Sequence, residues 1–219
     1  MQISSTFTLI TLLAFFPFAI HAESDAEKPN PYPNDYIIIK PLKWVSDYLP
    51  IYEAEGKEAF RFSKYRLDPF NGMTFVALMD PSSKASFKLS SNNDNHCNDE
   101  SKHEEDVKQK DNLPKRKFEK ERRKRKGDVW RFNVLPDGQD VRQYYKYYYN
   151  NKNIGGSIYK EGNGQKDELV GLIRTQKRNL VWVDPNQNTE TFTLSCANNS
   201  PVPEFATLLA LVFAKASDC

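Results

Sequence analysis

The chain has 219 residues and a formal net charge of only +2, from 31 basic and 29 acidic side chains. This balance points to no particular partner, and the length is sufficient for one large domain with its own core. Aromatic residues make up 13% of the chain, which excludes a largely disordered protein.

The first 22 residues differ from the rest. MQISSTFTLITLLAFFPFAIHA carries no Lys, Arg, Asp or Glu, and its apolar run from Leu9 to Ile20 precedes the small residue Ala22. This layout is typical of a secretory signal peptide, although no basic residue marks its start, and it is short for a membrane span. We expect cleavage after Ala22, an extracellular protein and no transmembrane helix in the mature chain. The alternative is an uncleaved N-terminus that anchors the chain to a membrane.

A polar, proline-rich linker over residues 23–35 precedes a domain that we expect to cover residues 36–219. Short runs of β-type composition alternate with turns from 36 to 89: YIIIK, LPIYEA, EAFRFSK, MTFVALMD and ASFKLS. From 128 onward such runs resume with DVWRFNVL, VRQYYKYYY, IGGSIYKE, ELVGLIRT, NLVWVD and ETFTLS. Their spacing predicts an antiparallel β meander.

Residues 91–127 interrupt this pattern with a charged insertion that has almost no apolar residues. Such a segment cannot bury enough apolar surface to offset the entropy of ordering it, so we expect a disordered loop. Its basic part could attract anionic lipid or polysaccharide, and a secreted chain would not meet nucleic acid. Behind a signal peptide, RRKR also resembles a furin- or kexin-type processing site. This predicted site consists of Arg122, Arg123, Lys124 and Arg125.

The stretch QYYKYYY places two sets of side chains on opposite faces of a strand, because successive residues alternate. Tyr145, Tyr147 and Tyr149 share one face and can fill a core. The other face carries two phenols around an ammonium, which is a candidate stacking platform for a sugar or another polar ligand. The β propensity of tyrosine explains the run as well. The candidate ligand-binding residues are Tyr144, Lys146 and Tyr148.

The C-terminal stretch PVPEFATLLALVFAKASDC predicts a helix over 202–216. Pro203 suits a first helical turn, Glu204 suits the positive end of the helix dipole, and the following residues are apolar around the whole circumference. A helix that is apolar on all sides must be buried on all sides. The run is too short for a membrane span or a lipid-anchor signal. We therefore predict a mainly β fold, with a closed antiparallel barrel of about 11–12 strands around this helix.

This order of elements resembles the tubby C-terminal-like fold, which tubby proteins, phospholipid scramblases and plant LURP-one-related proteins share. The matching stretches are NDYIIIKPLKWVSDYLPIYEAEGKEAFRF, like the hairpin that opens the barrel, and PVPEFATLLALVFAKASDC, like the helix that fills it. The resemblance covers about residues 35–219. Tubby proteins bind phosphoinositides through basic residues, yet no local motif carries those positions to this chain. The Cys-rich segment of scramblases is absent, so the resemblance implies a fold more than an activity.

Few residues outside the signal peptide have the chemistry of a catalytic or metal site. His96, Cys97 and His103 lie in the charged insertion, whose composition explains them, so we predict no metal and no cofactor. Asn198 heads a glycosylation sequon that the following Pro201 weakens. Cys97, Cys196 and Cys219 allow three disulfide pairings, and the sequence does not choose among them.

From these features we expect a secreted, non-enzymatic binding or interaction module whose ligand is unknown, with polysaccharide and anionic lipid as candidate ligands. The alternative is a membrane-associated lipid-binding or scramblase-like protein. A secreted enzyme with a carboxylate-based site is the third hypothesis.

Overall fold

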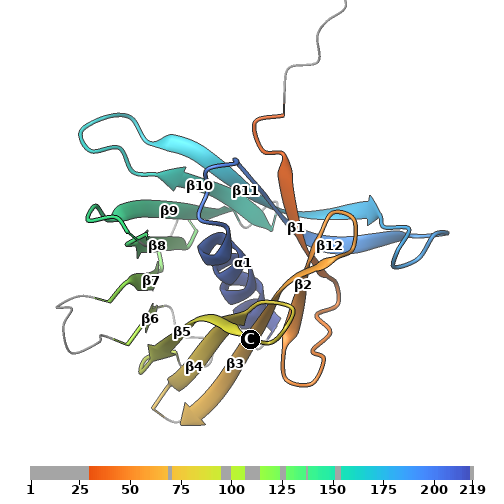
Figure 1. Cartoon of the computed structure of the whole chain (residues 1–219), viewed down its shortest axis with the longest axis horizontal. Helices are drawn as coiled ribbons and strands as arrows, with labels where there is room; N and C mark the ends of the chain where they lie inside the picture. The colour runs from red at the N-terminus through yellow and green to blue at the C-terminus, as the bar shows by residue number, and fades with distance from the viewer. Residues whose placement is uncertain are drawn as a thin grey trace, which may run out of the picture. The chain divides into compact units, whose positions relative to one another are not determined.

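A closed barrel of twelve antiparallel strands surrounds one α-helix in the part of the chain that the structure describes (Figure 1). This computed structural model describes residues 30–68, 71–94, 100–106, 114–123, 127–136, 138–150 and 154–217. The predicted fold class is confirmed. The strands are β1 Asn34–Ile39, β2 Leu49–Glu53, β3 Glu58–Asp68, β4 Met73–Met79, β5 Ala85–Ser91, β6 Ser101–Glu104, β7 Arg116–Glu121, β8 Val129–Val134, β9 Gln143–Asn150, β10 Gly155–Lys160, β11 Glu168–Asn179 and β12 Asn188–Cys196.

The strands form a meander in which each pairs with its neighbours in the sequence. The first and last strands close the ring, with a register that runs from Asn34 opposite Cys196 to Ile39 opposite Thr191. Closure leaves no free sheet edge in this ring, and it provides an interior that only apolar side chains can fill well.

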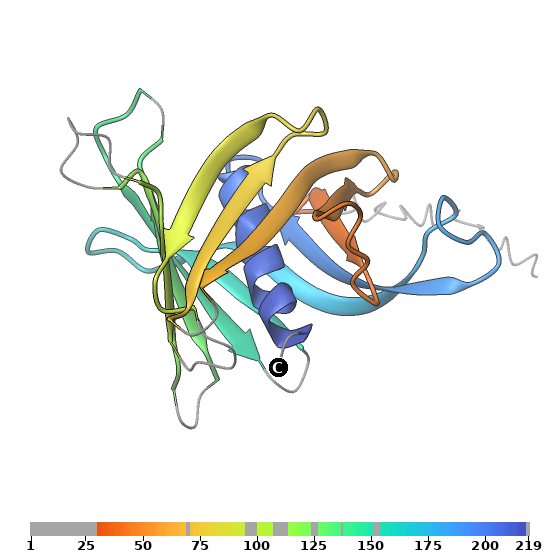
Figure 2. The same ribbon diagram turned by 90° about the horizontal axis from the view of Figure 1, so that it is seen from below.

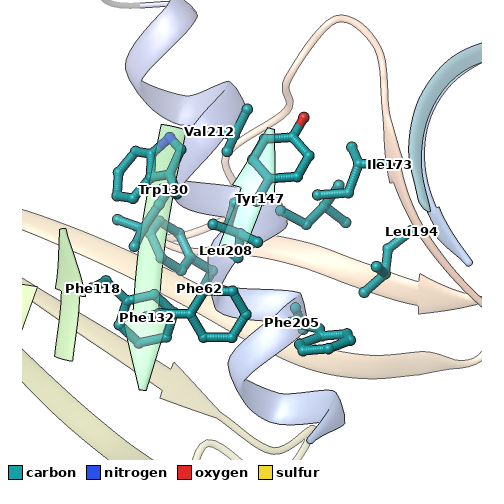
Figure 3. Close-up of a cluster of buried hydrophobic side chains, with 14 of the residues drawn as sticks. Phe62, Phe118, Trp130, Phe132, Tyr147, Ile173, Leu194, Phe205, Leu208 and Val212 are labelled. Carbon is teal, nitrogen blue, oxygen red and sulfur yellow. The ribbon is translucent and has the colours of Figure 1, made fainter. Parts of the chain in front are cut away.

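The helix α1, Val202–Ser217, lies inside the ring of strands (Figures 1 and 2). Leu208 and Leu209 have no exposed surface. Phe205 makes edge contacts with Phe132 and Tyr145, at ring-centre distances of 5.7 and 5.4 Å. Figure 3 shows side chains of α1 packed among aromatic residues of the barrel wall. Residues 204–214 of the helix are all buried, so its apolar side chains are covered on every side.

Part of the charged insertion belongs to the barrel, so the prediction of a disordered loop over 91–127 is wrong for β6 and β7. Alternation explains why such polar strands are ordered. On β7, Phe118 points inward and is fully buried, while Lys117 points outward and lies 3.8 Å from Glu104 and 2.6 Å from Glu119. Phe118 supplies an inward apolar contact, and Lys117 pairs with Glu104 across the strands and with Glu119 along β7. Residues 95–99, 107–113 and 124–126 lie outside the described residues.

Several predictions fall on segments that the structure does not describe. The signal peptide at 1–22 and most of the linker at 23–35 are among them, as are Cys97 and Cys219. Cys196 is buried at the end of β12 as a free thiol. No helix among the described residues is both long enough and apolar enough to cross a membrane.

Candidate functional site

The two faces of β9 have different surroundings. Tyr145 and Tyr147 point into the core and are almost completely buried, while 47% of Tyr144 and 38% of Tyr148 are exposed. Lys146 shares the outer face with the two exposed tyrosines. Figure 1 shows β9 between β8 and β10 in the wall. The alternation of the strand therefore places the three candidate ligand-binding residues together on the outside of the barrel.

The ammonium of Lys146 is already paired. Its Nζ lies 3.2 Å from Glu161 Oε1 and 3.9 Å from Asp167 Oδ2, and Arg131 on β8 lies 3.8 Å from the same Glu161 oxygen. Such partly exposed pairs stabilise the surface only modestly. Their main effect here is to fix the position of Glu161 beside β9.

The ring of Tyr148 also has neighbours. Tyr159 on β10 meets it edge-on at 5.8 Å, and the guanidinium of Arg123 lies 6.0 Å from its centre. Tyr144 has no such contact: within the described ranges, no aromatic ring or cation packs on its ring. Tyr144 is therefore the tyrosine of this face whose ring is available to a ligand.

A polar pocket of about 420 Å³ opens beside Tyr144. Residues 141–144 at the start of β9 line one side, and most residues from 160 to 168, at the connection between β10 and β11, line the other. The two sides are held together because the Glu161 backbone N–H donates to the carbonyl oxygen of Tyr144 at 2.9 Å. The pocket is thus a consequence of β9–β10 pairing.

Two neighbours of Tyr144 have fixed positions in the pocket wall. The guanidinium of Arg142 donates to the backbone oxygen of Pro114 at 2.8 Å and to Asn133 Oδ1 at 2.5 Å. Gln143 Oε1 accepts a hydrogen bond of 2.6 Å from the hydroxyl of Tyr145. Because the carbonyl oxygen of Gln143 is occupied, its amide N–H groups are available as donors.

Tyr145 is a reliable donor to Gln143. Its ring stacks on Phe132 at 5.0 Å and meets Phe205 of the helix edge-on. Burial, followed by the nearby charges of Glu204 and Glu168, raises the pKa of Tyr145 to about 12. The phenol therefore keeps its proton at physiological pH.

The remaining predicted sites are widely separated. Asn198 lies exposed between β12 and α1, and its Oδ1 accepts a hydrogen bond of 2.9 Å from Asn34 Nδ2. Arg122 and Arg123 directly follow β7, while residues 124–126, which include Lys124 and Arg125, lie outside the described residues. Glycosylation and processing at these positions stay predictions.

His103, which belongs to the charged insertion together with His96 and Cys97, points into the barrel. Its Nε2 lies 3.3 Å from Asp94 Oδ2, and Lys64 Nζ lies 2.9 Å from the same oxygen. Burial opposes ionisation of Asp94, but the hydrogen bond from His103 and the charges of His103 and Lys64 outweigh it and lower the pKa of Asp94. In the part of the chain that the structure describes, no group of three or more His, Cys, Asp or Glu side chains could hold a metal ion.

A second buried carboxylate lies on the first turn of α1. Glu204 Oε1 accepts a 2.7 Å hydrogen bond from Arg116 Nε, and Arg116 Nη1 also lies 3.0 Å from Glu105 Oε2. Burial raises the pKa of Glu204, and Arg116 only partly offsets this effect. Asp94 and Glu204 are thus enclosed in the barrel wall and core, each beside a cation.

The pocket residues of the β10–β11 connection could not be recognised in the sequence. EGNGQKDE has the composition of any surface turn, and nothing local marks it as one wall of a pocket. Strand pairing could have indicated this wall. Because β10 pairs with β9 in the antiparallel direction, the connection that follows β10 lies beside the start of β9, where Tyr144 stands.

Comparisons with known proteins give one match to a solved structure. No protein-family model matches the sequence, and no curated protein is significantly similar to it. The solved X-ray structure of a protein from Arabidopsis thaliana is similar, with a TM-score of 0.48 and 14% sequence identity. The similarity covers 84% of this chain and 91% of that chain. At this level of similarity no activity follows for the present protein.

Proposed function

We propose that this chain is a secreted, non-enzymatic binding module of the tubby C-terminal-like fold, and that it binds a carbohydrate in the pocket beside Tyr144. The observation that carries the proposal is the half-exposed ring of Tyr144 at the edge of a polar pocket of about 420 Å³. The fold assignment is supported by the element order, with an opening hairpin and an Ala/Leu-rich helix inside the barrel.

The chemistry of the pocket suits a sugar. A sugar ring has an apolar face, which stacks on an aromatic ring, and a rim of hydroxyl groups, which bond to amides and charged groups. Tyr144 offers the ring, while Gln143, Asn163 and Gln165 offer amides at the same pocket. The volume lies within the range of about 300–1,000 Å³ that is usual for small-ligand sites.

The lining of the pocket favours binding over catalysis. The residues that line it include no Ser, Thr, Cys or His side chain, so a hydroxyl, thiol or imidazole nucleophile is missing from this lining, and its only carboxylates are Glu161 and Glu168. Glu161, one of its two carboxylates, is shared between Lys146 and Arg131. We therefore place the carboxylate-based enzyme third among the hypotheses.

The experiment that tests the proposal compares two tyrosines of the same strand face. Tyr144→Ala should weaken binding to an oligosaccharide by about tenfold or more, since a stacked aromatic ring contributes on the order of 1 kcal/mol or more. Tyr148→Ala, whose ring packs on Tyr159, is the matched control and should bind almost as the native protein does. Isothermal titration against a panel of neutral and acidic oligosaccharides, with melting temperatures for both variants, gives the comparison. Binding that is independent of Tyr144, or no binding to the panel, would refute the proposal.

A lipid-directed, membrane-associated protein is the second candidate, and an exposed apolar patch favours it. Leu67 is 65% exposed, and Tyr65 on β3 and Met73 on β4 are 45% and 42% exposed. Co-sedimentation with phosphatidylserine vesicles that is lost in Leu67→Ser would support this candidate. Recovery of the native protein from the culture medium, and not from the membrane pellet, would favour the secreted binding module.

A further inference from the structure

The charges of the pocket beside Tyr144 do not balance. Its lining contains three cations, Arg142, Lys160 and Lys166, and two carboxylates, Glu161 and Glu168. One of these carboxylates, Glu161, is already neutralised from outside the lining by Lys146 and Arg131. The pocket therefore presents more positive than negative charge to a ligand.

The guanidinium of Arg142 is held by hydrogen bonds, but none of its partners neutralises its positive charge. Its guanidinium donates to the backbone oxygens of Pro114 and Lys115 and to the side-chain oxygen of Asn133, all of which are uncharged. Arg142 forms no ion pair with the described part of the chain. A carboxylate in the pocket would thus meet a fixed cation that has no negative partner.

The two lysines of the pocket are available as donors. Neither Lys160 nor Lys166 makes a side-chain hydrogen bond or an ion pair with any residue in the described ranges. Lys160 ends β10 and Lys166 lies in the following connection, and both residues line the same pocket. A lysine ammonium has three donor hydrogens and no acceptor, which makes an anionic acceptor its natural partner.

Gln143 adds a third donor of known direction. Since its Oε1 accepts the hydrogen bond from Tyr145, its Nε2 group must donate elsewhere, and Gln143 lines the pocket. The pocket that Tyr144 lines is therefore rich in donors. A ligand that fits needs an apolar face, oxygen acceptors and a negative charge.

We propose that the carbohydrate bound here is an acidic one, whose uronate ring stacks on Tyr144 and whose carboxylate is held by Lys160 and Lys166. This inference rests on the proposed function and names its ligand class. Gln143 donates to a ring or hydroxyl oxygen of the same sugar, and Arg142 supplies a long-range attraction. A neutral sugar would use the ring and the amide but leave both ammonium groups without a partner.

The test uses the full-length protein and three probes: trigalacturonate, its methyl ester and polyglutamate of similar charge. Titration calorimetry should show that the native protein binds trigalacturonate at least about tenfold more tightly than the ester, which corresponds to about one charge-assisted hydrogen bond. Raising the salt concentration should reduce this difference, because ions screen exposed charges. Polyglutamate, which has carboxylates but no sugar ring, should bind weakly.

Three variants separate the contributions of the residues. Lys160→Gln and Lys166→Gln should each lose most of the preference for the acid while they keep the affinity for the ester. Lys177→Gln, at an exposed position of β11 outside the pocket, is the matched control and should behave as the native protein. Melting temperatures of all three should stay close to the native value.

The possible results separate the acidic-sugar inference from the proposed carbohydrate binding on which it rests. Equal affinity for acid and ester, or lysine variants that keep the preference, would overturn the acidic-sugar inference and leave Tyr144-dependent sugar binding standing. If polyglutamate binds as tightly as trigalacturonate, the acidic-sugar inference is also overturned, because the pocket would then attract any polyanion without recognising a sugar. If neither sugar binds in a Tyr144-dependent manner, the proposed function itself fails.

Discussion

Two buried carboxylates of the barrel, Asp94 in the wall and Glu204 on the helix, have pKa values displaced in opposite directions. Both are more than nine-tenths buried, at 7% and 3% exposure. Burial alone raises a carboxyl pKa, as it does for Glu204. Asp94 overcomes the same effect, and its pKa falls below the usual range. Burial alone therefore does not decide the direction of the pKa shift, which depends on the hydrogen-bond and ion-pair partners of each carboxylate.

The partners differ in number and in how they are shared. Asp94 Oδ2 has three donors nearby, Lys64, His103 and Thr74, at 2.9, 3.3 and 3.2 Å. The carboxylate of Glu204 is paired with one cation, Arg116, and Arg116 is divided with a second carboxylate, Glu105. A buried charge is stable only when several donors compensate for its lost hydration.

Asp94 also lies where the barrel wall has the fewest ladder contacts. Among the described residues, β5 and β6 pair at one position, Ser90 opposite Glu104. Beyond this point side chains replace the ladder: Asn93 Oδ1 accepts a 2.8 Å hydrogen bond from the Lys102 backbone N–H, and Asp94 meets His103 of β6. The cluster around Asp94 thus joins β3 and β4 to β6, whereas Glu204 joins the helix to β7.

The largest effect is expected where a buried carboxylate has no partner at all. Leu209 is fully buried on α1, so Leu209→Asp places a charge in the apolar core and should prevent folding, at a cost of several kcal/mol. Leu209→Met, which nearly conserves volume, should cost less than about 1.5 kcal/mol and serves as the control. Circular dichroism and size-exclusion chromatography give the comparison. A soluble, folded Leu209→Asp protein would contradict the placement of the helix in the core.

Removal of Asp94 should have the next largest effect. Asp94→Ala leaves the charge of Lys64, only 10% exposed, buried without this carboxylate, and breaking a buried pair costs about 3–5 kcal/mol. For a domain of this size, the loss corresponds to a fall of roughly 10 °C in melting temperature. Asp140→Ala, in an exposed loop, should change it by very little. A melting temperature within about 2 °C of the native one would show that Lys64 does not need this carboxylate as a partner.

The comparison of β6 and β7 with the other strands shows what the sequence could predict. DVWRFNVL alternates between apolar and polar residues, and Trp130, Phe132 and Val134 are all buried as expected. The charged strands lack this signal, because Phe118 is the only apolar residue of RKFEKE and its pairing with the neighbouring strands is not local information. The helix was predictable because residues apolar on every face allow few environments.

The candidate site was predictable only in part, for a similar reason. Alternation within QYYKYYY identified Tyr144 as outward-facing, and its exposure agrees. The sequence also placed the ammonium of Lys146 between the two phenols, and the structure pairs it with Glu161, which lies fifteen residues away and reaches β9 only through the β9–β10 hairpin. Contacts that depend on strand register are invisible to a local pattern.

The acid dependence of stability should come from Asp94. Because its pKa is lower in the folded than in the unfolded chain, Asp94 contributes stability above the unfolded value of about 4, and this contribution is lost as the pH falls below it. Urea midpoints measured from about pH 6 to pH 3 should fall in the native protein and fall less in Asp94→Asn. His103 and Lys64 lie beside position 94 in both proteins, so the difference in slope reports the Asp94 carboxylate together with its pairing to these two residues. Parallel curves would mean that other carboxylates dominate the acid response.

Substitution of Glu204 should have the smallest effect on stability. Its contribution to the free energy of unfolding should depend on pH in the opposite sense to that of Asp94. Its raised pKa means that the folded protein binds this proton more tightly than the unfolded chain, so its ionisation lowers stability as the pH rises through the folded pKa. Glu204→Gln removes that charge and leaves Arg116 with Glu105 at 3.0 Å.

Urea unfolding at pH 7 should therefore give a free energy of unfolding for Glu204→Gln within about 1 kcal/mol of the native value. Relative to the native protein, the variant should become more stable as the pH rises. Arg116→Met is the informative companion, because it leaves Glu204 and Glu105 without their shared cation and should cost more than the glutamine variant. A Glu204→Gln variant as unstable as Asp94→Ala would mean that a single shared arginine stabilises a buried carboxylate as well as three donors do. The number of partners would then no longer explain why the two pKa values move apart.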